Sequence, residues 1–201
     1  MVMRKTGGHV ARAMPGDPVL NKLLAYWHAL RGERRAPMRR DLDPVEIAYG
    51  LDRIALLEVL ADGDLRCLLA GQQLVAALGR NATNLLGSQV LARRQRPDIW
   101  AVYDEAIALC EPRSGRSSIR LPDGTNVPYS RLLLPLLDTD ESVRWLLVAY
   151  ELRWPATRRP SLLGRVGPNF LSGIRRGAMT FGQTLDSVIG AVVAGAGRRR
   201  A

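Results

Sequence analysis

Three glycines divide the segment 65–87 into short pieces, and this segment limits the possible folds more than any other part of the sequence. An apolar run, Leu65–Ala70, stops at Gly71, and a helix-compatible run, Gln72–Leu78, stops at Gly79. A polar turn then leads to the third glycine. Because glycine adopts positive φ without a Cβ clash, we expect a strand, a short helix and tight corners within these few residues. Such a block usually frames a pocket or a small core, and it is not the pattern of a helical bundle or a doubly wound sheet.

The basic charge of the chain is concentrated near its two ends. The net charge is +10, of which residues 1–16 contribute +3 and residues 153–201 contribute +8, since the latter hold nine arginines and one aspartate. Residues 17–152 are close to neutral. This distribution argues against a basic groove built into the folded part, but it allows a tail that contacts phosphates or anionic lipid.

The composition is typical of a folded cytoplasmic protein. Hydrophobic residues make up 47% of the 201 residues, which is enough for the core of one domain with extensions. The first residues lack the apolar segment of a secretory signal, and no apolar run reaches the roughly 18 residues that a membrane span needs. Cys67 and Cys110 lie far apart in apolar segments, so we expect buried thiols and neither a disulfide nor a metal site.

An amphipathic helix is predicted ahead of the main body of the fold. Asp17 suits the N-cap of this helix, and Pro18 suits its first turn. Apolar residues then recur at i, i+3, i+4 and i+7 spacing, which gives the helix one apolar face. That face must pack either on the body or on a second copy of itself. The candidate dimer interface therefore consists of Leu20, Leu23, Leu24 and Trp27, together with Trp145 and Leu147 on the last predicted strand.

Apolar runs and turn residues predict the remaining elements. A short helix is predicted from a cap at Asp43 to Gly50, and a longer helix opens at Pro97. The predicted strands cover residues 54–60, 65–70, 117–121, 127–137 and 143–152, and the longer helix covers residues 98–110. Both faces of the last strand are apolar. We therefore expect the longer helix to cover one face of the sheet and the first helix to cover the other.

The order of these elements resembles a PAS domain: two strands, a group of short helices, one longer helix and three antiparallel strands. Three pieces of sequence, AYWHALRGERRAPMRRDLDP (25–44), LRCLLAGQQLVAALGRNATN (65–84) and SRLLLPLLD (130–138), are similar to a bacterial branch of PAS proteins. In that branch a single PAS domain makes up nearly the whole chain. The resemblance covers residues 20–154 and does not extend to the tail.

The resemblance implies an α+β fold. We expect a PAS-like five-stranded antiparallel sheet, with short helices and one long helix on one face, and an N-terminal flanking helix. The expected organisation is a flexible basic N-terminus (1–16), a helical flank (17–50), the PAS domain (51–154) and a basic, loosely ordered tail (155–201).

Members of the PAS family bind haem, flavin or small metabolites, or bind nothing and act as dimerising modules. Haem is disfavoured here, because a haem-binding member uses a histidine on or near the long helix, whereas His9 and His28 both precede the body. A photoactive flavin is disfavoured as well, because the corresponding turn has Ala82 where such members have a cysteine. We therefore predict no cofactor.

The remaining possibilities for the domain are a small apolar ligand or no ligand. The candidate pocket residues are Leu56, Glu58, Leu68, Trp100, Tyr103, Ile107, Leu134, Val148 and Tyr150. The simpler interpretation is that all of them belong to the core, since apolar stripes at helical spacing usually serve packing. Glu58 and Arg131 stand out as charges within apolar strands. Either one, if it points inward, must be paired or must meet a polar ligand.

The sequence contains no pattern typical of an enzyme. No His, Cys or carboxylate cluster has metal spacing, no phosphate-binding loop precedes a Lys-Ser/Thr pair, and two histidines support no Ser-His-Asp arrangement. We predict a sensory or signalling module that binds a small apolar ligand or a protein partner and forms a homodimer. The alternative is a protein that contacts anionic lipid or nucleic acid through residues 155–201. The signalling partner cannot be inferred from the sequence.

Overall fold

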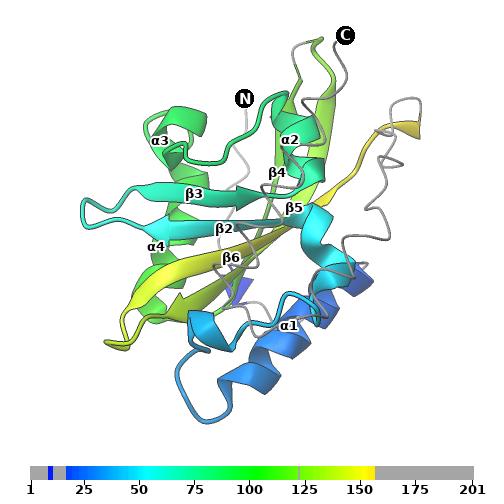
Figure 1. Cartoon of the computed structure of the whole chain (residues 1–201). Helices are drawn as coiled ribbons and strands as arrows, with labels where there is room; N and C mark the ends of the chain where they lie inside the picture. The colour runs from blue at the N-terminus through cyan, green and yellow to red at the C-terminus, as the bar shows by residue number, and fades with distance from the viewer. Residues whose placement is uncertain (1–8, 11–16, 122, 157–201) are drawn as a thin grey trace, which may run out of the picture.

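An antiparallel sheet is the centre of the computed structural model, which describes residues 9–10, 17–121 and 123–156 (Figure 1). Within this part of the chain the strand order is β1-β4-β5-β6-β2-β3, and all neighbours are antiparallel. The strands are β1 (His9–Val10), β2 (Ile54–Val59), β3 (Leu65–Ala70), β4 (Arg113–Arg120), β5 (Asn126–Leu137) and β6 (Val143–Leu152). The helices are α1 (Pro18–Arg31), α2 (Gln72–Leu78), α3 (Gly87–Val90) and α4 (Pro97–Leu109), with the 3-10 helices η1 (Arg39–Asp41) and η2 (Ala48–Arg53).

These elements confirm the α+β fold predicted from the sequence. The five expected strands, the short helices, the long helix α4 and the flanking helix α1 are all present. The bounds of β3, α2 and β6 agree with the prediction. β3 and α2 each end at a glycine, and β6 begins directly after a polar turn. The two-residue strand β1 extends the sheet beyond the predicted five strands by pairing with the start of β4.

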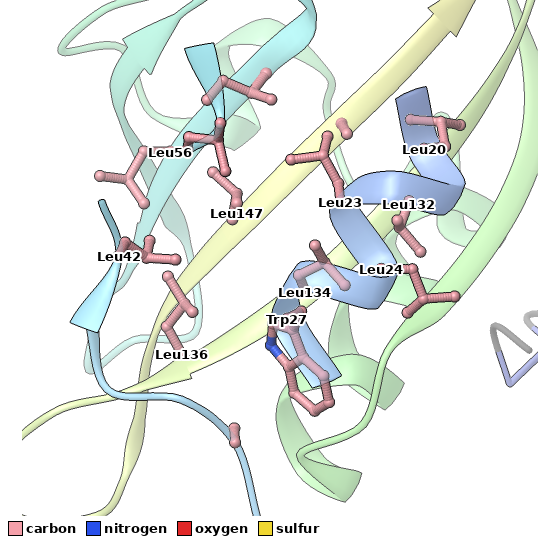
Figure 2. Packing of buried hydrophobic residues seen from close by; sticks show 14 of the residues in the cluster. Leu20, Leu23, Leu24, Trp27, Leu42, Leu56, Leu132, Leu134, Leu136 and Leu147 are labelled. Atoms are coloured by element: carbon pink, nitrogen blue, oxygen red, sulfur yellow. The ribbon is translucent and has the colours of Figure 1, made fainter. Parts of the chain in front are cut away.

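Helix α1 lies across one face of the sheet (Figures 1 and 2). The Asp17 side chain caps the helix, since its Oδ1 accepts hydrogen bonds from the backbone N–H groups of Val19 (2.7 Å) and Leu20 (3.1 Å). At the other end, the Trp27 Nε1–H donates to the carbonyl of Pro135 on β5 at 2.8 Å. The apolar face of the helix packs against leucines of β2, β5 and β6 in one continuous core cluster.

This packing contradicts the predicted dimer interface. Leu20, Leu23, Leu24, Trp27 and Leu147 are at most 4% exposed in the single chain, because α1 buries its apolar face on its own sheet. Trp145 is half-buried, and the guanidinium of Arg39 lies 4.1 Å from the centre of its ring. The helix therefore uses on its own sheet the surface that the sequence analysis assigned to a second copy.

The opposite face of the sheet carries a second core cluster, formed with α2 and α4. Leu74 of α2 and Trp100 of α4 pack there with Leu133 of β5 and Leu146 of β6. Both faces of the sheet are thus covered, as the apolar residues on both sides of β6 predicted. The face under α2 and α4 is the one that contains the cavity described below.

The three glycine corners differ from one another. Gly79 has a φ of +67°, in line with the prediction, but neither Gly71 (φ −65°) nor Gly87 has a positive φ. A Cβ at Gly71 would lie 2.6 Å from the carbonyl oxygen of Asp52, and a Cβ at Gly87 would lie 2.7 Å from the Trp100 ring. These two glycines are therefore required for close packing and not for backbone conformation.

The helix predicted from Asp43 to Gly50 is not formed. The chain makes turns there and then enters η2 at Ala48. The backbone N–H of Asp43 donates to the Tyr26 hydroxyl at 2.8 Å, and the Asp43 carboxylate accepts from the backbone N–H of Val45 at 2.8 Å. The local turn bond and the tie to α1 hold this segment against the first helix.

The predictions for the basic N-terminus and the basic tail fall mainly on residues 1–8, 11–16 and 157–201, which lie outside the described part of the chain. Within that part, no helix has the length and apolarity required to cross a bilayer.

Candidate functional site

A cavity of about 730 Å³ lies between the sheet and helices α2, α3 and α4. Leu74, Ala77 and Leu78 of α2 form one wall, and Val90 and Leu91 near α3 continue it. The sheet contributes the other wall. The floor and the α4 side are formed by Ala55, Leu57, Leu65, Cys67, Ile99, Trp100, Tyr103, Tyr129 and Tyr150. Most of the lining is apolar, and the volume of the cavity lies in the range of small-molecule sites.

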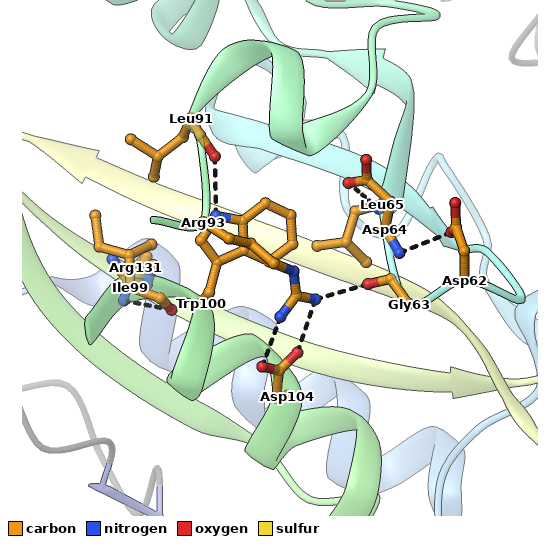
Figure 3. Close-up of polar contacts among 10 residues, drawn as sticks. All are labelled: Asp62, Gly63, Asp64, Leu65, Leu91, Arg93, Ile99, Trp100, Asp104 and Arg131. Atoms are coloured by element: carbon orange, nitrogen blue, oxygen red, sulfur yellow. Dashed lines mark hydrogen bonds and ion pairs between the residues drawn. The ribbon is translucent and has the colours of Figure 1, made fainter. Parts of the chain in front are cut away.

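The segment 84–96, which we call the strap, closes one side of the cavity. The Arg93 guanidinium makes two hydrogen bonds to Asp104 (2.9 and 3.0 Å), donates to the carbonyl of Gly63 (2.7 Å) and stacks on Trp100 (Figure 3). The Trp100 Nε1–H donates to the carbonyl of Leu91 at 2.9 Å. The strap is therefore fastened both to α4 and to the β2–β3 turn.

A carboxylate fastens the other end of the strap. Asp64 accepts hydrogen bonds from the hydroxyl and the backbone N–H of Ser88 and from the backbone N–H of Leu65. Burial raises the pKa of Asp64, but these hydrogen bonds and nearby Arg93 together hold it below its ordinary value. The carboxylate is therefore ionised at neutral pH, when it binds Ser88 most strongly.

Three tyrosines meet at the end of the cavity near β5 and β6. The hydroxyls of Tyr103 and Tyr150 are 3.1 Å apart, and the rings of Tyr129 and Tyr150 have centres 6.0 Å apart. Burial raises the pKa of Tyr150 well above its ordinary value and also raises the pKa of Tyr103. The two hydroxyls that form this pair are therefore protonated at neutral pH.

Arg131 lies behind these tyrosines and is only 1% exposed. Its Nη1–H donates to the Tyr129 hydroxyl at 3.2 Å, and its Nη2–H makes a long contact of 3.5 Å with the carbonyl of Ile99. Its Nε–H has no partner. Gly115 leaves room for the guanidinium, since a Cβ there would lie 3.0 Å from Nη2. Among the described residues no carboxylate forms an ion pair with Arg131.

Arg96 lies on the cavity wall, and its charge is neutralised by an ion pair. Arg96 forms a two-fold pair with Asp98 (3.0 and 2.9 Å), and it donates to the Ser117 hydroxyl at 2.7 Å. The hydrogen bonds and charge of Asp98 raise the pKa of Arg96. Arg96 therefore has a counter-charge, whereas Arg131 has none among the described residues.

The structure places only some of the candidate pocket residues at the cavity. Trp100, Tyr103 and Tyr150 line it. Ile107 and Val148 belong to the same apolar cluster but do not reach the lining. Their assignment to the lining is corrected, since they pack within the core beside it.

Four other candidates are corrected because they lie on the side of the sheet that faces α1. Leu56, Leu134 and Leu68 pack in the cluster with α1. Glu58 shares the Leu56 face of β2, where its carboxylate pairs with Arg66 (3.7 Å) and Arg144 (3.2 Å). Both faces of β2 are apolar, so the period-2 pattern does not show which face meets the cavity.

Several lining residues were missed by the sequence analysis, among them Cys67 and Tyr129. Tyr129 could have been found, because it lies two residues before Arg131 and so shares its face of the strand. Burial raises the pKa of the Cys67 thiol to about 11, so this thiol is not a reactive thiolate. No group of three His, Cys, Asp or Glu side chains in the described residues is placed to hold a metal ion.

A model of the PAS domain matches residues 16–150. The chain belongs to the PAS domain family. This match covers most of the chain and includes α1 and the strands from β2 to most of β6. PAS domains are generally sensory, non-catalytic modules that commonly dimerise and interact with signalling partners. No curated protein matches the chain.

Solved structures of PAS and light-oxygen-voltage (LOV) domains are similar to the chain. An RNA-binding LOV receptor gives a TM-score of 0.45 at 14% identity over 73% of this chain, which spans 39% of the receptor's length. A LOV protein of Rhodobacter sphaeroides gives 0.41 at 16% identity over 74% of this chain and 90% of that one. The PAS domain of Bordetella pertussis BvgS gives 0.33 at 16% identity over 57% and 90%.

The prediction of no cofactor, with photoactive flavin disfavoured, is overturned by these comparisons. Most of the similar structures are LOV domains, and one was studied with a flavin analogue. The exclusion of flavin rested on Ala82, and this residue bears only on the formation of a covalent adduct. An alanine there removes the thiol of a covalent adduct, but it does not prevent a ring system from occupying the cavity. The exclusion of flavin is therefore withdrawn.

Proposed function

We propose that this PAS domain is a sensory module that responds to a small molecule bound in the cavity between the sheet and helices α2–α4. The observation that carries the proposal is the cavity itself. A concave site of about 730 Å³ with a mainly apolar lining and a few polar groups has the size and character of small-molecule sites, which favours an occupant.

The position of the cavity suggests how binding reaches the surface. A ligand would touch Trp100, which is tied to the strap through Leu91 and Arg93, and Tyr150 on β6. β6 lies near the centre of the sheet, where it pairs with β5 on one side and β2 on the other. Binding would thus bias both a surface segment and the centre of the sheet, which is the kind of two-state change that signalling requires.

Native mass spectrometry of the full chain, purified gently from its own host, tests this proposal. The wild-type protein should retain a small molecule. Leu78→Trp, which fills part of the cavity from a half-buried position of α2, should retain less of it. Wild-type protein that carries no bound molecule, and whose thermal stability is unchanged by any compound of a metabolite panel, would contradict the proposal.

We also propose that the module is a homodimer, as is common in this family. Because α1 buries its apolar stripe on its own sheet, the dimer must use other surfaces. Light scattering after size-exclusion chromatography of the full chain tests this point, and a monomer at high concentration would contradict it.

A second candidate function rests on charge. Residues 155–201 carry eight arginines and one aspartate, a net charge of +7, and we propose that they contact anionic lipid or nucleic acid under the control of the PAS domain. Deletion of residues 157–201, followed by pelleting with anionic vesicles and with DNA, tests this proposal.

A further inference from the structure

One end of the cavity presents hydrogen-bond donors without acceptors. The Tyr129 hydroxyl accepts a hydrogen bond from Arg131, which leaves its own proton without an acceptor among the described residues. In the Tyr103–Tyr150 pair one hydroxyl donates to the other, so one of the two protons is also left over. Behind the tyrosines, and not itself part of the lining, the Nε–H of Arg131 has no partner among the described residues. An occupant that satisfies this end must therefore supply acceptors.

The same end carries a positive charge that nothing in the described chain neutralises. Arg131 is buried at 1% exposure and has no ion-pair partner there, and the cavity lining contains no aspartate or glutamate. Of the two arginines in the lining, Arg96 already has Asp98 as its counter-charge, and Arg120 on β4 is exposed to solvent. A buried, unpaired charge is unfavourable, and its attraction for an anion is strong because little water screens it.

The tyrosines connect this charge to the cavity. Ile99, Tyr103 and Tyr129 all line the cavity, and all three also contact the Arg131 side chain. The guanidinium carbon lies 5.6 Å from the centre of the Tyr103 ring and 5.9 Å from that of Tyr129. An acid group bound at the tyrosine hydroxyls would therefore lie close to Arg131. On the opposite side, α2 and residues 85–91 of the strap present an apolar surface to the ligand, formed by Leu74, Ala77, Leu78, Leu85, Val90 and Leu91.

We propose that the cavity binds an anionic amphiphile, with its acid group at the hydroxyls of Tyr103 and Tyr129, in front of Arg131, and its apolar body against α2 and the apolar residues of the strap. The acid is a carboxylate, sulfonate or phosphate. This inference rests on the proposed function, namely that the cavity takes a small molecule, and it adds the chemical class of that molecule. Arg131 acts as the counter-charge behind the tyrosines, and the hydroxyls make the direct contacts.

Two fluorescent probes that differ only by an acid group test the inference. 1-Anilinonaphthalene-8-sulfonate carries one sulfonate, and N-phenyl-1-naphthylamine has the same rings without it. Each is titrated into the full chain at raised salt, which screens solvent-exposed charges. We expect the sulfonate probe to bind at least about tenfold more tightly than the neutral probe, the size of effect that a charge-assisted hydrogen bond produces.

Substitutions then show whether Arg131 causes this preference. Arg131→Met should reduce the preference to about onefold, with the affinity for the neutral probe unchanged, and Arg131→Lys should restore much of it. The matched control is Arg116→Met, which removes the same charge from an exposed position on β4 and should leave the preference intact. A purely structural role of Arg131 would weaken both probes alike. Tyr129→Phe, which keeps the ring, should also lower the preference and provides a test if Arg131→Met does not fold.

The two proposals fail in different ways. If both probes bind with equal affinity in wild type, and Leu78→Trp weakens both, the cavity takes small molecules but the anionic class is wrong. If neither probe is affected by Leu78→Trp, neither binds in the cavity, and both proposals are contradicted. A preference that survives in both Arg131→Met and Tyr129→Phe would also overturn the inference.

Discussion

At the scale of single residues, Arg131 connects the sequence, the packing and the proposed ligand. The sequence analysis singled out this residue as a charge within an apolar strand, and the structure places it in the core, where no carboxylate of residues 17–121 or 123–156 forms an ion pair with it. Gly115 on the neighbouring strand provides the space that the guanidinium needs. The glycine and the arginine are paired across β4 and β5, so two strands together accommodate one buried charge.

Arg131→Met should raise the stability of the ligand-free protein. The substitution replaces a buried, unpaired charge with an apolar side chain of similar length, which should increase the free energy of unfolding by about 1 kcal/mol. Chemical denaturation of ligand-free protein measures the change, with Arg116→Met as an exposed control expected to lie within about 0.5 kcal/mol of wild type. A clear loss of stability in Arg131→Met would show that the guanidinium is a structural necessity.

The glycine corners give a second prediction for single residues. Gly71→Ala should lower the free energy of unfolding by about 3 kcal/mol, because its Cβ would meet backbone atoms of Leu51 and Asp52 that have no room to move. Gly79→Ala should cost about 1 kcal/mol, since it has open space but a positive φ. Thermal or chemical unfolding of both variants checks this order, and equal losses would contradict it.

At the scale of elements, sequence reasoning succeeded where a run of residues has a clear end. β3 and α2 end at glycines and β6 begins after a polar turn, so their bounds could be predicted. Which partner an apolar face meets could not be read from the pattern. Leu56 was assigned to the pocket and faces α1, while its neighbour Leu57 faces the cavity. The register of β2 shifts between these two residues, and both faces of the strand are apolar.

The strap is the element whose attachment should depend on pH. The pKa of Asp64 is lowered in the folded protein, so its stabilising contribution is present at neutral pH and is lost as the pH falls below about 4. We expect the amide protection factors of the strap, which compare the measured exchange with the intrinsic rate at the same pH, to fall in acid and to fall equally in Asp64→Asn at pH 7. Asp140→Asn is the matched control, because Asp140 makes the same pair of bonds to Ser142 in the β5–β6 turn. A strap that exchanges equally fast in wild type and Asp64→Asn would contradict this role.

At the scale of the whole molecule, a near-neutral PAS body is joined to a strongly basic C-terminal segment. Deletion of residues 157–201 should abolish pelleting of the protein with anionic vesicles or with DNA, and binding by the full chain should weaken as salt rises. Neutral vesicles serve as the control, and comparison of the vesicle and DNA arms shows which of the two the segment prefers. Failure of the full chain to pellet with either at low salt would remove this function.

Amide hydrogen exchange of the full chain, with and without saturating 1-anilinonaphthalene-8-sulfonate, tests most directly whether this PAS domain senses a molecule held between α2–α4 and the sheet. Exchange should slow in α2, in the strap and on β6 around Tyr150, whereas α1 on the opposite face should be unchanged. Protection confined to α1 or to the chain ends, or no protection around the cavity at saturation, would contradict the account.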